Sequence, residues 1–478
     1  MTPSRDTWSS PLAERYASQA MLALWSPNRR YGLWRRLWLA LAEGEQSLGV
    51  AIPDEALAQM RAHLDDIDYD AVAKYEKEFR HDVMAHVYAF GDVAPAARKH
   101  IHLGATSAYV TDNADLILMR EGLSLLRDKV MGALSALADF ARQWRAEPAL
   151  GYTHLQPAQL TTVGKRATLW MQDLVLDLTD IDTRQAALPL RGVKGTTGTQ
   201  ASFLELFHGD HGKVRALEMH VCKAMGFGKA LPVTGQTYSR KIDAQVLGVV
   251  AGIATSAAKF SSDIRMLQSF GELSEPFESG QIGSSAMAYK RNPMRSERIA
   301  SLARFVGALE PNANQTHAVQ YFERTLDDSA NRRLVIPEAF LATDAILLLM
   351  ENVARGLEVH GARIRNRVLD ELPFMATEQL IVRAVEAGAD RQVIHEIIRR
   401  HSVEAASAMK NNGKSNDLLE RLERDHEFPR GVDLKAAADP SRYIGRAPEQ
   451  VDEFLLEVVE SLLSSAPVQR GAPEAIRV

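Results

Sequence analysis

Residues 112–145 read DNADLILMREGLSLLRDKVMGALSALADFARQWR. Apolar residues recur there every three or four positions, at Leu116, Met119, Leu123, Leu126, Val130, Leu134, Leu137, Phe140 and Ala141. This spacing places one apolar stripe along a helix, which at 1.5 Å per residue is roughly 50 Å long. Because a helix of that length cannot bury its stripe inside one small compact domain, the stretch predicts a long bundle or an oligomer.

Four further long helical patterns follow along the chain. They cover residues 160–188, 243–269, 293–309 and 329–357. Polar, glycine-rich connections separate them, and strand-like alternation is scarce. The sequence therefore predicts an all-α protein with a central bundle of five long helices.

Shorter patterns flank this bundle on both sides. Residues 34–48 and 54–63 read as short helices, and the part after residue 357 is broken by glycines and prolines. On these grounds we expect three domains. They are an N-terminal helical domain (1–111), the central long-helix bundle (112–358) and a C-terminal helical domain (359–478).

The composition argues against several functional classes. The chain has 478 residues, a net charge of −5 and one cysteine, Cys222. The charge argues against broad binding to nucleic acid or to a membrane, and one cysteine excludes internal disulfides and cysteine zinc clusters. The N-terminus lacks a signal-peptide core and no apolar run reaches about 18 residues, so we expect a cytoplasmic protein. No metal site, Walker loop or dinucleotide fingerprint is found.

The most informative loop is residues 280–298, GQIGSSAMAYKRNPMRSER. Gly283, Ser284 and Ser285 provide a glycine and two hydroxyls, and four cations follow them. Asn292 and Pro293 then mark a turn before a helix start. Hydroxyls and cations beside a helix N-terminus predict a polyanionic ligand.

Two short polar clusters precede the first long helix. Arg80-His81-Asp82 is either a solvated helix start or a cluster in which the carboxylate orients an imidazole or binds a polar ligand. Thr106 and Ser107 lie where small hydroxyls cap helices. A helix start with spare donors is equally a carboxylate site, so both interpretations stay open.

His154 lies in the stretch YTHLQPAQ, which we expect to be a loop before the second long helix. A histidine in such a loop is either structural or a proton donor, since its pKa lies near the working pH.

The stretch FERTLDDSANRR holds a candidate phosphate site. Ser329 and Arg333 are four residues apart on an expected helix, so a hydroxyl and a guanidinium share one face. The alternative is that Arg332 and Arg333 make surface ion pairs with Asp327 and Asp328, which carry little energetic weight.

Several of these motifs resemble those of one known superfamily. The loop of residues 280–298 is similar to the serine loop of the fumarase/aspartase superfamily, usually written Gly-Ser-Ser-x-Met-Pro-x-Lys-x-Asn-Pro. Ala288 stands where proline is usual, which loosens the loop backbone but removes no chemical group. Within the superfamily the chain resembles the adenylosuccinate lyase family, in a form like that found in animals. The matching motifs run from about Ser10 to Arg446 and include RHDVMAH, HLGATS, QPAQLTTVGKR, GVKGTTGTQASFL, TGQTYSRK and ELPFMATE.

The resemblance implies a three-domain fumarase/aspartase-like fold. It also implies a homotetramer that assembles through the central bundles, with each active site built from three subunits. The implied substrates are small molecules, adenylosuccinate and succinyl-aminoimidazole carboxamide ribotide (SAICAR). Both would lose fumarate by β-elimination in purine nucleotide biosynthesis, without a cofactor.

The resemblance also implies roles for single residues. Ser284 would be the base, although Ser285 is chemically equivalent and only alignment to the family selects between them. His154 would be the acid, with His81 in reserve, and Lys290 would stabilise the alkoxide. The implied substrate-binding residues are Arg15, Tyr16, Arg80, His81, Asp82, Thr106, Ser107, Thr153, Gln236, Lys290, Asn292, Arg298, Arg324, Ser329 and Arg333.

Two alternatives remain beside this interpretation. One is a sister lyase or cycloisomerase, acting for example on argininosuccinate. The phosphate-type stretch from Arg324 to Arg333 argues against it. The other is a non-catalytic helical oligomer, against which the presence of Ser284, His154 and Lys290 argues.

Overall fold

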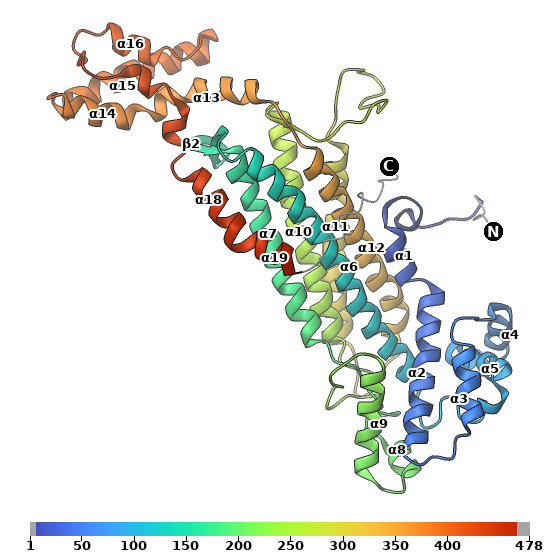
Figure 1. Ribbon diagram of the computed structural model, residues 1–478. Coiled ribbons are helices and arrows are strands. Elements are labelled where there is room, and N and C mark those ends of the chain that lie inside the picture. Colours follow the sequence, from blue (N-terminus) through green and yellow to red (C-terminus); the bar gives the residue numbers. More distant parts are fainter. Residues whose placement is uncertain (1–5, 466–478) are drawn as a thin grey trace.

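The computed structural model describes residues 6–465 of the chain (Figure 1). Five long helices form its central bundle: α6 (Ser107–Gln143), α7 (Val163–Ala187), α10 (Lys241–Ser269), α11 (Met294–Ala318) and α12 (Asp327–Gly356). Every one of the nine apolar positions predicted along the first long helix is buried in α6. Burying a leucine-sized side chain contributes about 1.5–3 kcal/mol, so this stripe alone holds α6 firmly in the bundle. The all-α prediction is confirmed.

The helices of the bundle approach one another closely. Gly122 of α6 faces the Phe340 ring of α12, where a Cβ atom at position 122 would lie 2.7 Å from Phe340 Cε1. Any larger residue there would push the two helices apart.

The N-terminal helices are α1 (Gln19–Leu24), α2 (Pro27–Ser47), α3 (Asp54–Ala62), α4 (Tyr69–Phe79) and α5 (Asp82–Val93), with a π-helical turn at Leu12–Tyr16 and a 3₁₀ turn at Pro95–Ala97. Of these helices, α3, α4 and α5 lie beside one end of the bundle, α1 lies along its side, and α2 runs between them (Figure 1). Two helices from the middle of the chain, α8 (Ala201–Leu206) and α9 (His211–Ala224), join the same end. The first of the predicted short helices begins at Pro27 rather than Trp34, because Ser26 caps it by accepting from the Arg29 N–H.

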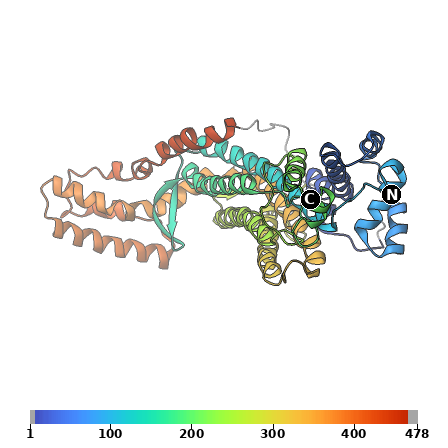
Figure 2. The same cartoon turned by 90° about the horizontal axis from the view of Figure 1, so that it is seen from below.

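The C-terminal part divides between two places. α13 (Gly361–Met375) leads away from the bundle to α14 (Thr377–Glu386), α15 (Arg391–Asn412), α16 (Leu418–Arg424) and α17 (Leu434–Ala437). These last four helices share a separate apolar core and project beyond the bundle (Figures 1 and 2). After a 3₁₀ turn (Pro440–Tyr443), the chain returns along α7 as α18 (Ala447–Phe454), a π-helical turn (Leu455–Val459) and α19 (Glu460–Ser465).

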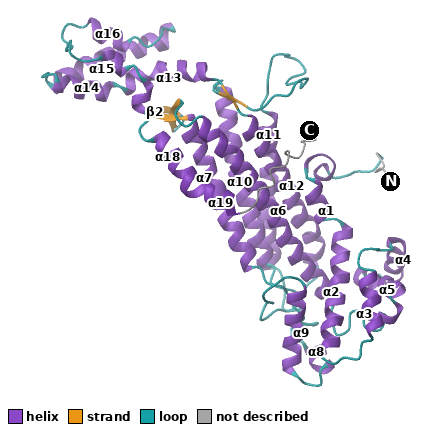
Figure 3. Ribbon diagram, viewed as in Figure 1, coloured by secondary structure: helices purple, strands orange, loops and turns teal. Residues whose placement is uncertain are grey.

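Strands are few and lie at one end of the bundle (Figure 3). β1 (Pro148–Thr153) and β2 (Gln156–Thr162) form an antiparallel hairpin, and β3 (Leu273–Ser274) pairs antiparallel with β4 (Glu358–Val359). The prediction that the stretch around His154 forms a loop before the second long helix is therefore wrong, because its residues belong to this hairpin. The second long helix starts at Val163 and not at Leu160, since Thr162 caps it with its hydroxyl on the Lys165 N–H at 3.0 Å.

α11 also ends later than predicted, at Ala318 instead of Leu309. It continues through Pro311, and beyond this proline Ala313 and Thr316 are still buried. α10 is long and apolar enough to cross a membrane, but half of its apolar window is buried, as in the core helix of a bundle.

The two ends of the bundle are far apart. We call them the α5 end, where α6, α10 and α12 begin, and the hairpin end, where α6 and α10 finish and the serine-rich loop lies (Figure 1). α10 has 29 residues, so it separates the two ends by roughly 43 Å. This separation decides which of the candidate residues meet.

Candidate active site

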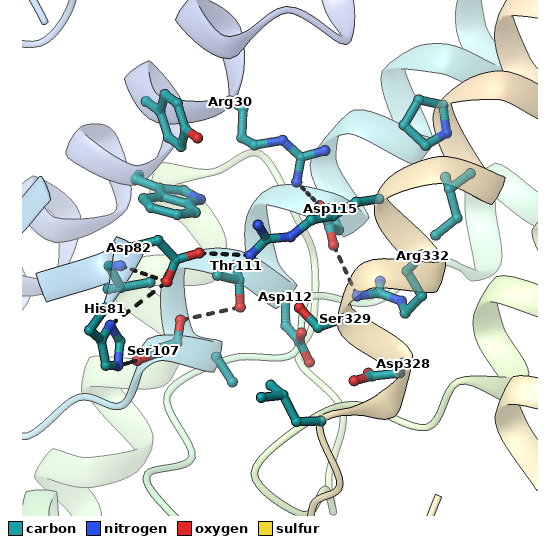
Figure 4. Close-up of a pocket in the computed structure, with 18 of the residues that line it drawn as sticks. Arg30, His81, Asp82, Ser107, Thr111, Asp112, Asp115, Asp328, Ser329 and Arg332 are labelled. Carbon is teal, nitrogen blue, oxygen red and sulfur yellow. Dashed lines mark hydrogen bonds and ion pairs between the residues drawn. The ribbon is translucent and has the colours of Figure 1, made fainter. Parts of the chain in front are cut away.

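A cavity of about 730 Å³ opens at the α5 end of the bundle (Figure 4). α1 and α2, the start of α5, the start of α6, the turn before α10 and the start of α12 surround it. Eight of the predicted substrate-binding residues line it: Arg80, His81, Asp82, Ser107, Gln236, Arg324, Ser329 and Arg333.

His81 is held in one orientation by the backbone of α5. Arg80 adopts a left-handed conformation (φ 55°) and ends α4, and His81 then caps α5 by accepting from the Met84 N–H at 3.3 Å. Because Nδ1 accepts this bond, a neutral imidazole carries its proton on Nε2. That nitrogen lies 3.4 Å from the Ser107 hydroxyl, so a donor is aimed at the start of α6.

Asp82 is bonded to a cation of α12. One of its oxygens accepts from Arg333 at 2.7 Å, and the other accepts from the Val83 N–H at 2.8 Å. Burial raises the pKa of Asp82, but the hydrogen bonds from Arg333 and Val83 outweigh it, so this pKa lies below its ordinary value. Asp82 is therefore an anion at neutral pH.

The start of α6 keeps hydroxyls available. Thr106 occupies the capping position, yet its side chain makes no capping hydrogen bond. Ser107 faces His81, and its carbonyl accepts from the Thr111 hydroxyl at 3.2 Å (Figure 4). Capping therefore does not occupy the Thr106 hydroxyl, and the N-terminus of α6 beside it is a place where an anion can bind.

The wall behind the phosphate-type stretch is a buried ion-pair network. Arg332 is only 9% exposed and bonds to Asp243 at 2.7 Å and Asp115 at 3.1 Å. Asp328 is fully buried and accepts from Arg240 at 2.7 Å. The alternative of surface ion pairs is therefore wrong for Arg332 and Asp328, while Arg333 remains at the cavity.

Sequence reasoning missed the partners in this network. They are Asp112, Asp115, Tyr238, Arg240 and Asp243. The two acids of α6 resemble ordinary helix-start acids, which stabilise a helix dipole without any partner. The available signal was that Asp112 and Asp115 sit among buried apolar residues, where a carboxylate needs a cation.

Both backbone groups of Gln236, its N–H and its carbonyl, are hydrogen-bonded. Its N–H donates to the Glu323 carbonyl at 2.9 Å, and its own carbonyl accepts from the buried Arg191 at 2.8 Å. Gly235 allows this approach, since a Cβ atom there would lie 2.6 Å from the Glu323 carbonyl oxygen. The turn before α10 is thus tied to the turn before α12.

The serine-rich loop lies at the hairpin end. The Ser284 hydroxyl oxygen accepts from the backbone N–H groups of Ala286 at 3.3 Å and Met287 at 3.1 Å. Ser285 is exposed, and the part of the chain that the structure describes gives it no such bonds. Asn292 closes the loop by donating to the Gly283 carbonyl at 2.7 Å, and Lys290 is exposed on the same loop.

The base of this loop is firmly anchored. The buried Glu275 accepts from the N–H groups of Arg295 and Ser296 at 2.9 Å each, which caps the start of α11. Gln268 holds the Arg291 carbonyl at 2.9 Å. By contrast, large apolar side chains at the tip are exposed: Ile282, Met287 and Tyr289.

His154 occupies the tip of the β1–β2 hairpin. His154 (φ 54°) and Leu155 (φ 57°) are both left-handed, which is the signature of a type I′ turn. The imidazole is exposed, as is Thr153 beside it. The hairpin therefore presents a histidine outward from the end of the bundle.

Three more predicted residues lie together near the start of α11. The Arg298 guanidinium lies 5.4 Å from the centre of the Tyr16 ring, and that of Arg15 lies 6.0 Å from it. None of them lines the cavity at the α5 end. One chain therefore brings together the cavity residues, but not Ser284, His154 or the Arg15–Tyr16 pair with them.

The comparisons with known proteins define the class first. A family model described as Lyase matches residues 27–307. The fold is that of 3-carboxy-cis,cis-muconate lactonizing enzyme from Pseudomonas putida (TM-score 0.80, 22% identity, covering 94% of this chain and 98% of that one). It is also that of a fumarate lyase from Mesorhizobium sp. BNC1 (TM-score 0.78, 23% identity, 92% and 98% covered). The chain is thus a lyase of the fumarase/aspartase superfamily.

The family within that class follows from the sequence matches. A model described as Adenylosuccinate lyase C-terminus matches residues 373–454. Adenylosuccinate lyases of Saccharomyces cerevisiae and Schizosaccharomyces pombe are 52% and 50% identical to this chain, each over 96% of both chains. That of Schistosoma mansoni is 46% identical, again over 96% of both. The chain belongs to the adenylosuccinate lyase family.

Proposed function

We propose that this protein cleaves adenylosuccinate to AMP and fumarate, and SAICAR to its free amide and fumarate. The observation that carries the proposal is the single cavity that combines Arg324, Ser329 and Arg333 with His81 and Ser107. The first three suit a nucleotide phosphate, and the start of α6 suits a succinyl carboxylate. Membership of the adenylosuccinate lyase family supports the same substrates.

The reaction is a β-elimination that breaks a C–N bond. A base removes a proton from the carbon next to one carboxylate, and an acid protonates the departing nitrogen. The first step is difficult because this carbon acid is weak, and it is helped most by donors that stabilise the carboxylate as it takes up charge. Thr106, Ser107, Lys290 and Asn292 are the donors we assign to it.

Ser284 is the proposed base. A serine hydroxyl is a poor base unless its alkoxide is stabilised. The N–H groups of Ala286 and Met287 already point at its oxygen, and Lys290 on the same loop would supply a positive charge. This local geometry favours Ser284 over its exposed neighbour Ser285.

His154 is the proposed acid. Its imidazole is exposed at the tip of the hairpin. From there it can reach a substrate that is bound in the cavity of another subunit. Histidine suits proton donation because it exchanges a proton near neutral pH. His81 stays the reserve candidate, since it already lies in the cavity beside Ser107.

The complete site requires more than one copy of the chain. The 29 residues of α10 separate the cavity from the serine-rich loop by roughly 43 Å, and the 37 residues of α6 separate Ser107 from the hairpin by roughly 55 Å. We propose a homotetramer in which three subunits supply the cavity, the hairpin and the serine-rich loop of each site.

The test is the change in ultraviolet absorbance when adenylosuccinate is added to the purified protein. We expect cleavage of adenylosuccinate and SAICAR, and none of argininosuccinate. Equal cleavage of the dephosphorylated nucleoside would contradict the phosphate assignment. No turnover of either nucleotide would contradict the proposed function.

A further inference from the structure

Arg240 joins three segments of the chain inside the wall of the cavity. It is 1% exposed and immediately precedes α10. Its Nε donates to Asp328 of α12 at 2.7 Å, and its two terminal nitrogens donate to Asp112 of α6 at 3.1 and 3.2 Å. Asp112 in turn accepts from the Tyr238 N–H at 3.0 Å, so it also holds the turn before α10.

Each of these three segments carries residues of the proposed nucleotide site. The start of α6 carries Ser107, the turn before α10 carries Gln236, and the start of α12 carries Ser329 and Arg333. Arg240 itself is almost fully buried, and it lies in the cavity wall beside them. Its guanidinium is thus the link that sets their mutual spacing.

We infer that Arg240 is a positioning residue for the nucleotide, an inference that rests on the proposed function. It holds Gln236, Ser329 and the start of α6 at the separation that one nucleotide spans. It does so through its hydrogen bonds to Asp112 and Asp328.

The shape of the guanidinium explains why arginine occupies this position. The planar group bonds sideways to Asp328 through Nε and end-on to Asp112 through its two terminal nitrogens. Lysine has one compact ammonium, which cannot make both sets of bonds from the same place. Arg240→Lys keeps the charge buried between the two acids but loosens one of the two segments.

Of the segments that Arg240 joins, the turn before α10 and the start of α12 bind the nucleotide, and the start of α6 carries Ser107, which we assign to the carboxylate. The two residues that transfer protons, Ser284 and His154, lie on other segments. A loosened link therefore weakens binding more than the chemical step. We expect Arg240→Lys to raise the KM for adenylosuccinate about 10-fold or more and to change kcat less than about 3-fold.

Arg35→Lys is the matched control. Arg35 is 2% exposed and donates to the His63 carbonyl at 2.5 Å and to Asp66 at 3.3 Å, which ties α2 to the loop before α4. It is an equally buried arginine that does not line the cavity. We expect it to lower the thermal midpoint as Arg240→Lys does, with KM within about 2-fold of wild type.

The experiment measures KM, kcat and the thermal midpoint for the wild type, Arg240→Lys and Arg35→Lys tetramers. If Arg240→Lys does not fold, Asp112→Asn replaces it, because asparagine keeps one acceptor and weakens the same link. A KM rise specific to the Arg240 or Asp112 variant supports the inference. Equal KM values in that variant and Arg35→Lys overturn it, and a wild type that does not turn over adenylosuccinate overturns the proposed function instead.

Discussion

An Asp82 oxygen lies 2.7 Å from a guanidinium nitrogen of Arg333, so two side chains assigned to the same nucleotide are bonded to each other. A phosphate that binds Arg333 at this nitrogen competes with the Asp82 carboxylate for its N–H donors. The pair also links the first residue of α5 to α12. If a phosphate replaces Asp82 as the partner of Arg333, the ion pair that joins α5 to α12 is thus broken.

Removing the competing charge should strengthen phosphate binding. We expect Asp82→Asn to bind inorganic phosphate about 2- to 5-fold more tightly, since an ion pair between partly exposed groups is worth at most ~1 kcal/mol. Titration calorimetry measures this, with Asp70→Asn in the first turn of α4 as the control. Weaker phosphate binding by Asp82→Asn would show that the two groups do not compete.

The two adjacent serines of the loop should behave differently. Ser284→Ala removes the oxygen held by two backbone N–H groups, so we expect kcat to fall by at least ~10²-fold with nucleotide binding largely intact. Ser285→Ala should stay near wild type. Steady-state kinetics of both variants decide the matter, and the reverse pattern would move the base to Ser285.

The phosphate contacts should affect KM rather than kcat. Arg333→Ala and Ser329→Ala each remove a group that we assign to the phosphate, and we expect KM to rise about 10-fold for the arginine and less for the serine. The dephosphorylated nucleoside serves as the comparison substrate. If its KM rises by the same factor, the two residues contact another part of the substrate.

Two inactive variants should restore each other in mixed assemblies. His154 and Ser284 lie on different segments of the hairpin end, and we assign them to different subunits of one site. His154→Ala and Ser284→Ala mixed after reversible dissociation should therefore regain part of the wild-type rate, because some sites receive both wild-type residues. Proven subunit exchange without recovered activity would refute shared sites.

A buried carboxyl should make stability depend on pH. Glu45 of α2 is 0% exposed and neither of its oxygens has a hydrogen-bond partner among the described residues, and burial raises its pKa from 4.5 to about 9. The folded chain then binds one proton more than the unfolded chain between these values. Its contribution to the free energy of unfolding therefore falls by roughly 1.4 kcal/mol per pH unit as pH rises through that window.

Glu45→Gln removes this dependence. We expect the variant to be little changed at about pH 5 and clearly more stable than wild type at about pH 8. Denaturant midpoints at the two pH values measure it, with the exposed Glu55→Gln as the control. An equal difference at both pH values would mean that Glu45 does not titrate on unfolding.

The long helices were predictable because their signal is local. Nine apolar residues of the stretch 112–145 recur every three or four positions, which predicts one buried helix face. All nine of these residues are buried in the structure. Ser329 and Arg333 were paired for the same reason. The hairpin was missed because QPAQ is polar and contains proline, and only its pairing with β1 makes it a strand.

The ion-pair network was unpredictable for a different reason. Arg240 and Asp112 are 128 positions apart, and Arg332 and Asp243 are 89 apart. No spacing rule joins such residues, because their contact exists only after the helices have packed. A sequence pattern shows which residues are charged, but it does not show which acid pairs with which base in the folded chain.

The length of the bundle limits where insertions and deletions in the chain are tolerated. One helical turn inserted into α6 alone would move the hairpin about 5.4 Å relative to the serine-rich loop, which follows α10. The five long helices must therefore lengthen or shorten together. Insertions and deletions are better tolerated in the α14–α16 region, which projects beyond the bundle and where Gly413 opens an exposed connection.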